Sequence, residues 1–124
     1  MKSILIVISS SELRDRFSDI LSQAGYHVIT AASGEGALEL ATSVDPDLVL
    51  MAIVMPKLDG LQTASRLRAL VGAKSRPIVL LGTVPPIGLD EQPLASLVDD
   101  YLNLDVGSDE LLACVARHAV TGTV

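Results

Sequence analysis

The sequence predicts a three-layer α/β domain in which helices cover both faces of a five-stranded parallel sheet. The first observation is that short apolar segments, among them 4–8 and 48–54, contain no polar residue, which is typical of strands buried on both faces. The second is that strand and helix patterns alternate five times with short connections. A doubly wound sheet of this kind predicts the strand order 2-1-3-4-5 of flavodoxin-like domains.

The first two strands are expected over 4–8 and 27–31, which are rich in aliphatic or β-branched residues. Between them a helix begins near Glu12, with N-cap candidates in Ser9-Ser10-Ser11 and a left-handed final residue at Gly25. The apolar stripe of this helix consists of Leu13, Phe17, Ile20, Leu21 and Ala24.

The middle of the chain predicts two further helices around the third strand, 48–54. Ser33 is expected to cap the second helix, which stops before Asp45-Pro46 because the residue before a proline disfavours helix. The third helix is expected over 61–71. The residues expected to face the core are Ala37, Leu38, Leu40 and Ala41 in the second helix and Ala64, Leu67 and Val71 in the third.

The last third predicts strands over 77–81 and 100–104. Between them we expect a loop over 82–88 and a short helix over 93–98. Ser108 is expected to cap the final helix. Residues 1–124 therefore form one domain, which an output domain could follow in a longer protein.

Composition and charge exclude several classes of function. A net charge of −6 and only three aromatic side chains argue against a nucleic-acid surface. No targeting segment or membrane-spanning stretch is visible.

The single cysteine, Cys114, is consistent with a reducing cytoplasm, where we expect the protein. It shares a helix face with His118 and is interpreted as a buried structural thiol. Both His27 and His118 are interpreted as ordinary, partly buried residues rather than metal ligands.

In this fold, chemistry gathers just past the carboxyl ends of the strands, here 8–10, 52–54, 82–83 and 103–105. These residues include no histidine, cysteine or lysine and only one carboxylate, that of Asp105. Acid–base catalysis and hard metal ions both require more than this, so we expect neither an enzyme nor a metal site. The hydroxyls of Ser9, Ser10 and Ser11 could hold an anion, or could simply cap the first helix.

Six motifs along nearly the whole chain indicate a family. They are Ile-Leu-Ile-Val (4–7), Ala-Gly-Tyr (24–26), Ala-Ala-Ser-Gly (31–34), Pro-Asp-Leu-Val-Leu (46–50), Met-Pro-Lys-Leu-Asp-Gly (55–60) and Asp-Asp-Tyr-Leu (99–102). Together they resemble the receiver domain of response regulators in two-component signalling. The resemblance implies a flavodoxin-like signalling module that acts through protein partners.

The resemblance fails where receivers carry their chemistry. In that family an acidic pair after the first strand holds Mg²⁺, and an aspartate at the end of the third strand accepts the phosphoryl group. A hydroxyl residue and a lysine end the fourth and fifth strands, and a proline follows the lysine. The corresponding residues here are Ile8, Ser9, Ala52, Gly82, Leu104 and Asp105, with Thr83 one place after the hydroxyl position. Tyr101 keeps the position of the switch aromatic. The resemblance therefore implies a degenerate pseudo-receiver that needs no Mg²⁺.

The expected function is phosphorylation-independent signalling by contact with a protein partner or a second copy of the chain. The family's usual partner face falls on the fourth helix, fifth strand and fifth helix, here Leu94 to Val98, Tyr101 and Leu112 to Val120. Two alternatives remain open. This face could simply be packed, or the former phosphorylation pocket could bind a small anionic metabolite, which would make the domain a sensor.

Overall fold

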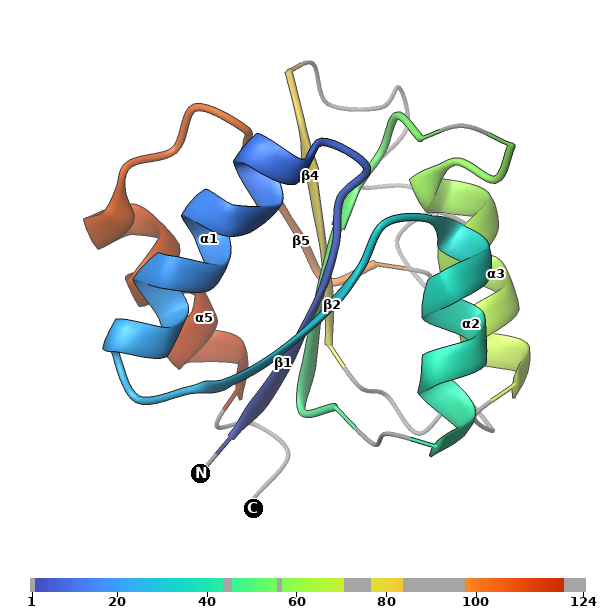
Figure 1. Ribbon diagram of the computed structural model, residues 1–124, viewed down its shortest axis with the longest axis horizontal. Coiled ribbons are helices and arrows are strands. Elements are labelled where there is room, and N and C mark those ends of the chain that lie inside the picture. The colour runs from blue at the N-terminus through green and yellow to red at the C-terminus, as the bar shows by residue number, and fades with distance from the viewer. Residues whose placement is uncertain (1, 44–45, 56, 71–76, 84–97, 120–124) are drawn as a thin grey trace.

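The fold is described from a computed structural model for residues 2–43, 46–55, 57–70, 77–83 and 98–119 (Figure 1). Five strands form one parallel sheet in the order β2-β1-β3-β4-β5, as predicted. The strands are β1 (Ser3–Val7), β2 (His27–Ala31), β3 (Leu48–Ala52), β4 (Ile78–Gly82) and β5 (Asp100–Asn103).

Four helices of the described chain cover the two faces of the sheet, which confirms the three-layer architecture. They are α1 (Ser11–Gln23), α2 (Gly34–Ser43), α3 (Gly60–Leu70) and α5 (Ser108–Ala119). Figure 1 shows α1 and α5 side by side on one face, and α2 and α3 on the other. None of the helices in the described ranges is long and apolar enough to span a membrane.

The core lies on both faces of the central strands, and every residue of β3 and β4 is buried. The helices contribute Phe17, Leu21, Ala37, Ala64, Leu67, Leu111 and Val115 to it. The predicted apolar stripe of α1 is thus largely confirmed. Ala24 is the exception: it is exposed because it is the C-cap residue, beyond the last turn that packs on the sheet.

Several strand ends differ from the predicted ones by one or two residues. β3 ends at Ala52 rather than at 54, and Val54 is 84% exposed. β1 lies one residue earlier than 4–8, β4 one residue later than 77–81, and β5 ends one residue before 104. In an apolar run, the last residue that is hydrogen-bonded in the sheet looks the same as the apolar residue after it. The strand ends predicted from the sequence therefore differ by one or two residues.

The helix termini confirm two predicted signals and correct a third. Ser33 caps α2 through its Oγ, and Gly25, with φ of 98°, follows α1 in the left-handed conformation. Ser108 is not the cap of α5. It is the first helical residue, and the Gly107 carbonyl accepts the Leu111 N–H at 3.0 Å, so Gly107 takes the N-cap place. α1 and α3 each begin one residue before the predicted start, at Ser11 and Gly60.

Three predicted features lie wholly or partly outside the described residues. These are the loop over 82–88 beyond Thr83, the short helix over 93–98 except Val98, and the end of the third helix at Val71. Of the predicted partner face, the described part is Val98, Tyr101 and the segment 112–119.

Candidate functional site

The sheet brings the predicted site residues together at the carboxyl edge of its strands. In the strand register Ala52 is paired with Leu81, and Gly82 with Asn103. The Leu104 N–H donates to the Gly82 carbonyl at 2.9 Å, and Ile8 continues directly from β1. Ile8, Ala52, Gly82 and Leu104 therefore lie along one edge, as the parallel topology requires.

The side chains at this edge are mostly apolar and buried. Ile8 is 2% exposed and Ala52 is 5% exposed, while Leu104 is half-buried. Ser9, Thr83 and Asp105 are exposed. The Asp105 backbone N–H donates to Asn103 Oδ1 at 2.8 Å in the turn that follows β5. Among the described residues at this edge, the buried side chains are apolar, and the hydroxyl and carboxylate side chains are exposed.

Ser10 acts as the N-cap of α1, one of the two roles that the sequence left open. Its Oγ accepts the Leu13 N–H at 3.4 Å, and its carbonyl accepts the Arg14 N–H at 2.9 Å. The side-chain oxygen of Ser10 is therefore engaged in capping the first turn of α1. Ser9 and Ser11 are exposed beside it.

Two arginines of α1 bind backbone carbonyls in the loops around this edge, and neither role could be predicted from the sequence pattern. Arg14 Nη1 donates to the Ile8 carbonyl at 2.8 Å and lies 3.4 Å from the Ser9 carbonyl. Arg16 Nη2 donates to the Val106 carbonyl at 2.6 Å. Arg16 belongs to α1, 90 residues from its acceptor, so only the folded chain brings the two together.

The ring of Tyr101 lies beside Gly82. A side-chain carbon added at Gly82 would lie 3.3 Å from Tyr101 Oη and 3.1 Å from Ile53 Cδ1. The Tyr101 hydroxyl is buried and, within the described structure, makes no hydrogen bond. Burial raises the pKa of the Tyr101 phenol above its usual value. The aromatic side chain thus occupies the room that a residue larger than glycine would need.

The turn after β3 explains the motif at 55–60. Asp59 and Gln62 form a capping box at the start of α3: Asp59 Oδ1 accepts the Gln62 N–H at 2.8 Å, and Gln62 Oε1 accepts the Asp59 N–H at 3.1 Å. A side-chain carbon at Gly60 would lie 2.5 Å from the Ala52 carbonyl oxygen. This glycine is therefore required by the close approach of α3 to the end of β3.

The two acidic residues at 99–100 have separate roles at the other end of the sheet. Asp99 Oδ2 accepts the Ile78 N–H at 2.8 Å and pairs with Arg68 Nη2 at 2.9 Å, which joins β4, α3 and the start of β5. Asp100 faces α5 instead, where it meets Arg117 and His118.

Comparison with known proteins gives a consistent family. The response regulator receiver domain family matches residues 4–116. Protein PilG of Pseudomonas aeruginosa is 29% identical over 97% of this chain and 89% of its own length. The transcriptional regulator RpaA of Synechocystis is 33% identical over 93% of this chain, which spans about half (48%) of that regulator.

Solved structures agree. The chemotaxis protein CheY4 of Vibrio cholerae has a TM-score of 0.88 at 28% identity, covering 95% of this chain and 98% of that one. The receiver domain of the histidine kinase PA1611 of Pseudomonas aeruginosa, with a magnesium ion coordinated in its active-site cleft, has a TM-score of 0.86 at 27% identity. That match covers 97% of this chain and 98% of that chain. The chain therefore belongs to the response regulator receiver domain family of two-component signalling proteins.

Proposed function

We propose that this receiver domain signals through protein contact without being phosphorylated. The observation that carries the proposal is that apolar, buried side chains, those of Ala52 and Ile8, stand at the carboxyl edge of the sheet. A methyl group at the end of β3 offers no nucleophile for a phosphoryl group. Ser9 and Asp105, both exposed, are the polar side chains available at the positions that the family uses for Mg²⁺ and its surroundings.

The magnesium ion that the family implies does not fit this donor set. Hard divalent cations bind to several oxygen ligands, mostly carboxylates. Ile8, Ala52 and Leu104 contribute no ligand atom from their side chains. A site lined in this way also avoids the repulsion between neighbouring carboxylates that a metal ion would otherwise offset.

The loops at this edge are held by contacts that need no ligand. Arg14 and Arg16 bind carbonyls of the β1–α1 and β5–α5 connections with charge-assisted hydrogen bonds of 2.8 and 2.6 Å. Tyr101 packs beside Gly82, which has no side chain that could move it. These contacts support a domain that keeps a single conformation, which a partner binds without a preceding phosphorylation step.

The proposed contact surface is the described part of the β5–α5 face. The outer side of α5 presents Ala113, Ala116 and Arg117 to solvent, with Leu112 half-buried and Tyr101 on the neighbouring strand. Arginine and tyrosine are enriched in protein–protein interfaces, and the short side chains of the two alanines leave room for a partner to approach the helix. The partner is either another protein or a second copy of this chain.

The test of phosphorylation independence is an amide-resolved NMR titration with Mg²⁺, then with Mg²⁺ plus beryllofluoride, a phosphoryl mimic. We expect no saturable shifts at Ser9, Ala52, Thr83 or Tyr101, and no mass increase after incubation with acetyl phosphate. The receiver domain of PA1611 serves as the positive control for magnesium. Saturable shifts at these four amides, or a phosphorylated species, would contradict the proposal.

The contact surface is tested separately with Ala113→Glu and Ala116→Glu, which place charge on the outer side of α5. Ala69→Glu, at an exposed position of α3, is the matched control. Sedimentation measures self-association, and quantitative pull-down measures capture of other proteins. We expect the α5 variants, and not the control, to lose the contact, with or without Mg²⁺ and acetyl phosphate.

The second candidate function is a sensor for a small anion, and the position of Arg14 favours it. The Arg14 guanidinium lies 3.4 Å from the Ser9 carbonyl, and Ser9 and Ser11 are exposed residues of the same serine run. Titration with inorganic phosphate separates the two proposals. A sensor predicts saturable shifts at 9–11 that Arg14→Gln removes, whereas the contact proposal predicts none.

A further inference from the structure

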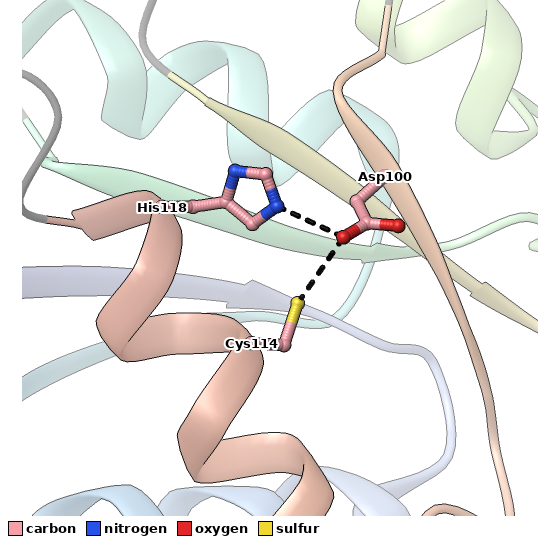
Figure 2. Close-up of side chains that lie close together, drawn as sticks. All are labelled: Asp100, Cys114 and His118. Atoms are coloured by element: carbon pink, nitrogen blue, oxygen red, sulfur yellow. Dashed lines mark hydrogen bonds and ion pairs between the residues drawn. The ribbon is translucent and has the colours of Figure 1, made fainter.

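A cluster of three metal-ligating side chains lies at the amino edge of the sheet, away from the former phosphorylation site. Cys114 and His118 are four residues apart on α5, so they share one face of the helix. Asp100, the first residue of β5, points toward both (Figure 2). From the sequence, Cys114 is expected to be a structural thiol and His118 an ordinary residue, because no third ligand is near them in the chain. Asp100 joins them only through the β5–α5 packing.

The three ligand atoms already converge. Asp100 Oδ2 lies 2.9 Å from His118 Nε2 and 3.7 Å from Cys114 Sγ (Figure 2). All three atoms lie within 4.8 Å of one another. In tetrahedral zinc sites the usual bond lengths imply about 3.3 Å between nitrogen and oxygen ligands and about 3.6 Å between sulfur and oxygen. The sulfur–oxygen distance is therefore near the value required. The imidazole must move away from the carboxylate and lie about 3.6 Å from the sulfur, from which its ligand nitrogen is now within 4.8 Å.

We propose that Asp100, Cys114 and His118 form a binding site for a zinc ion, with water as the fourth ligand. The combination of a thiolate, an imidazole and a carboxylate suits Zn²⁺ and excludes the hard cations Mg²⁺ and Ca²⁺. The site differs in position and in ligand chemistry from the magnesium site that the family implies.

The surroundings of the cluster fit a cation. Cys114 and His118 lie in the second half of α5, where the helix dipole favours positive charge. Arg117 Nη2 pairs with Asp100 Oδ2 at 2.9 Å, and its side chain is 61% exposed. It therefore competes for the carboxylate but can turn into solvent when the metal binds. His118 and Asp100 are partly exposed, which gives the ion a path from solvent to the buried sulfur.

Binding is coupled to the loss of the Cys114 thiol proton. Burial, and next the negative charge of Asp100, raise the pKa of the Cys114 thiol to about 11. Zn²⁺ therefore replaces the thiol proton, which passes to the buffer, and forms a zinc–sulfur bond. His118 binds as the neutral imidazole through Nε2, and Asp100 binds as the carboxylate. The bound ion joins the first residue of β5 to the last turns of α5.

The first experiment adds Co²⁺, a spectroscopic substitute for Zn²⁺, to the full chain after treatment with a chelator. We expect a thiolate-to-cobalt charge-transfer band together with the intense visible bands of tetrahedral cobalt, both removed by one equivalent of Zn²⁺. Competition with a chromophoric chelator then gives the zinc affinity. Absence of the charge-transfer band would overturn the proposal, because it reports directly on the bond to Cys114.

Variants assign the ligands. We expect Cys114→Ala, His118→Gln and Asp100→Asn each to weaken zinc binding by at least about tenfold. His27→Gln, which changes the exposed histidine of β2, is the matched control and should bind like the wild type. Arg117→Gln should bind more tightly because it removes the competing cation. His118→Gln that keeps wild-type affinity and a folded NMR spectrum would overturn the assignment.

Discussion

The side chain of Tyr101 combines a ring that fills space with a hydroxyl that lowers stability. Its hydroxyl is buried beside Gly82 and, in the described part of the chain, has no hydrogen-bond partner. A buried polar group without a hydrogen-bond partner lowers the stability of the fold relative to an apolar side chain of similar shape at the same position. The ring, in contrast, fills space that glycine leaves open.

Tyr101→Phe should therefore leave the free energy of unfolding unchanged or raise it by up to about 1 kcal/mol. Urea denaturation of the two proteins measures the difference, and Tyr26→Phe, at a partly buried position before β2, is the control for loss of a phenol. A loss of more than about 1 kcal/mol would mean that the hydroxyl has a partner in the native protein.

Gly60 is the second residue whose identity is set by one contact. A side-chain carbon there would lie 2.5 Å from the Ala52 carbonyl oxygen, a backbone atom that cannot move without shifting β3. We expect Gly60→Ala to lower the free energy of unfolding by about 1–3 kcal/mol. Gly107→Ala is the control without a steric contact, because nothing lies within 4 Å of the added carbon, and its own loss reports only the lower N-cap preference of alanine. Equal effects in the two variants would contradict this explanation.

Cys114 gives a pH dependence with a definite sign. Its folded-state pKa is raised to about 11, first by burial and then by Asp100, while Arg117 opposes the shift and Glu110 adds to it. The folded protein therefore retains the thiol proton at a pH where the unfolded chain releases it. This contribution to stability is complete below the unfolded pKa and is lost as pH rises toward 11.

In metal-free protein with chelator present, Cys114→Ala should remove this dependence. We expect the wild type to lose about 1 kcal/mol more stability than the variant between pH 8 and pH 10. Denaturant unfolding at the two pH values measures the difference. Parallel pH profiles for the two proteins would show that the thiol ionises equally easily in both states.

Helix α1 is the element that organises the edge of the sheet. Its buried stripe, Phe17 and Leu21, packs on the sheet, and its two arginines reach the loops at either side. Arg16 also lies over the Phe17 ring, 5.2 Å from its centroid, which fixes the guanidinium near the Val106 carbonyl. The helix thus orders the loops at both sides of this edge through its own arginine side chains.

Arg16→Gln should loosen the connection between β5 and α5. We expect a loss of about 1–2 kcal/mol, since hydrogen bonds from a charged group exceed neutral ones but this side chain is partly exposed. Hydrogen exchange should accelerate at 104–107 more than in the central strands. Arg66→Gln, at an exposed position of α3, is the control, and equal effects from both variants would contradict the prediction.

For the whole molecule, the composition of the carboxyl edge predicts that stability is independent of magnesium. A ligand stabilises a fold only if it binds the native state. With Ile8 and Ala52 buried at that edge, we expect millimolar Mg²⁺ to change the melting temperature by less than about 1 °C. Differential scanning fluorimetry measures this. A shift of several degrees in chelator-treated protein would contradict the prediction.

Much of this architecture followed from the sequence because its signals are local. Uninterrupted apolar runs at 48–54 and 77–81 predicted buried parallel strands, and the structure confirms both, with ends displaced by one or two residues. The motif at 55–60 predicted a turn before a helix, and Asp59 and Gly60 supply its cap and its close approach. Turns and helix caps depend on residues that are close together in the sequence, so they can be predicted from it.

Three features could be predicted from the sequence alone: the order of the strands, the family, and the lack of carboxylate side chains at 8–10, 52–54 and 82–83. Three others became visible in the folded chain: Arg14 and Arg16 bind the loops, Tyr101 lies against Gly82, and Asp100 joins Cys114 and His118. Arg16 and Val106 are 90 residues apart, and Asp100 and His118 are 18 apart in different elements. Such contacts arise from the packing of α1 and α5 on the sheet, and no pattern along the chain encodes the direction in which a long side chain turns.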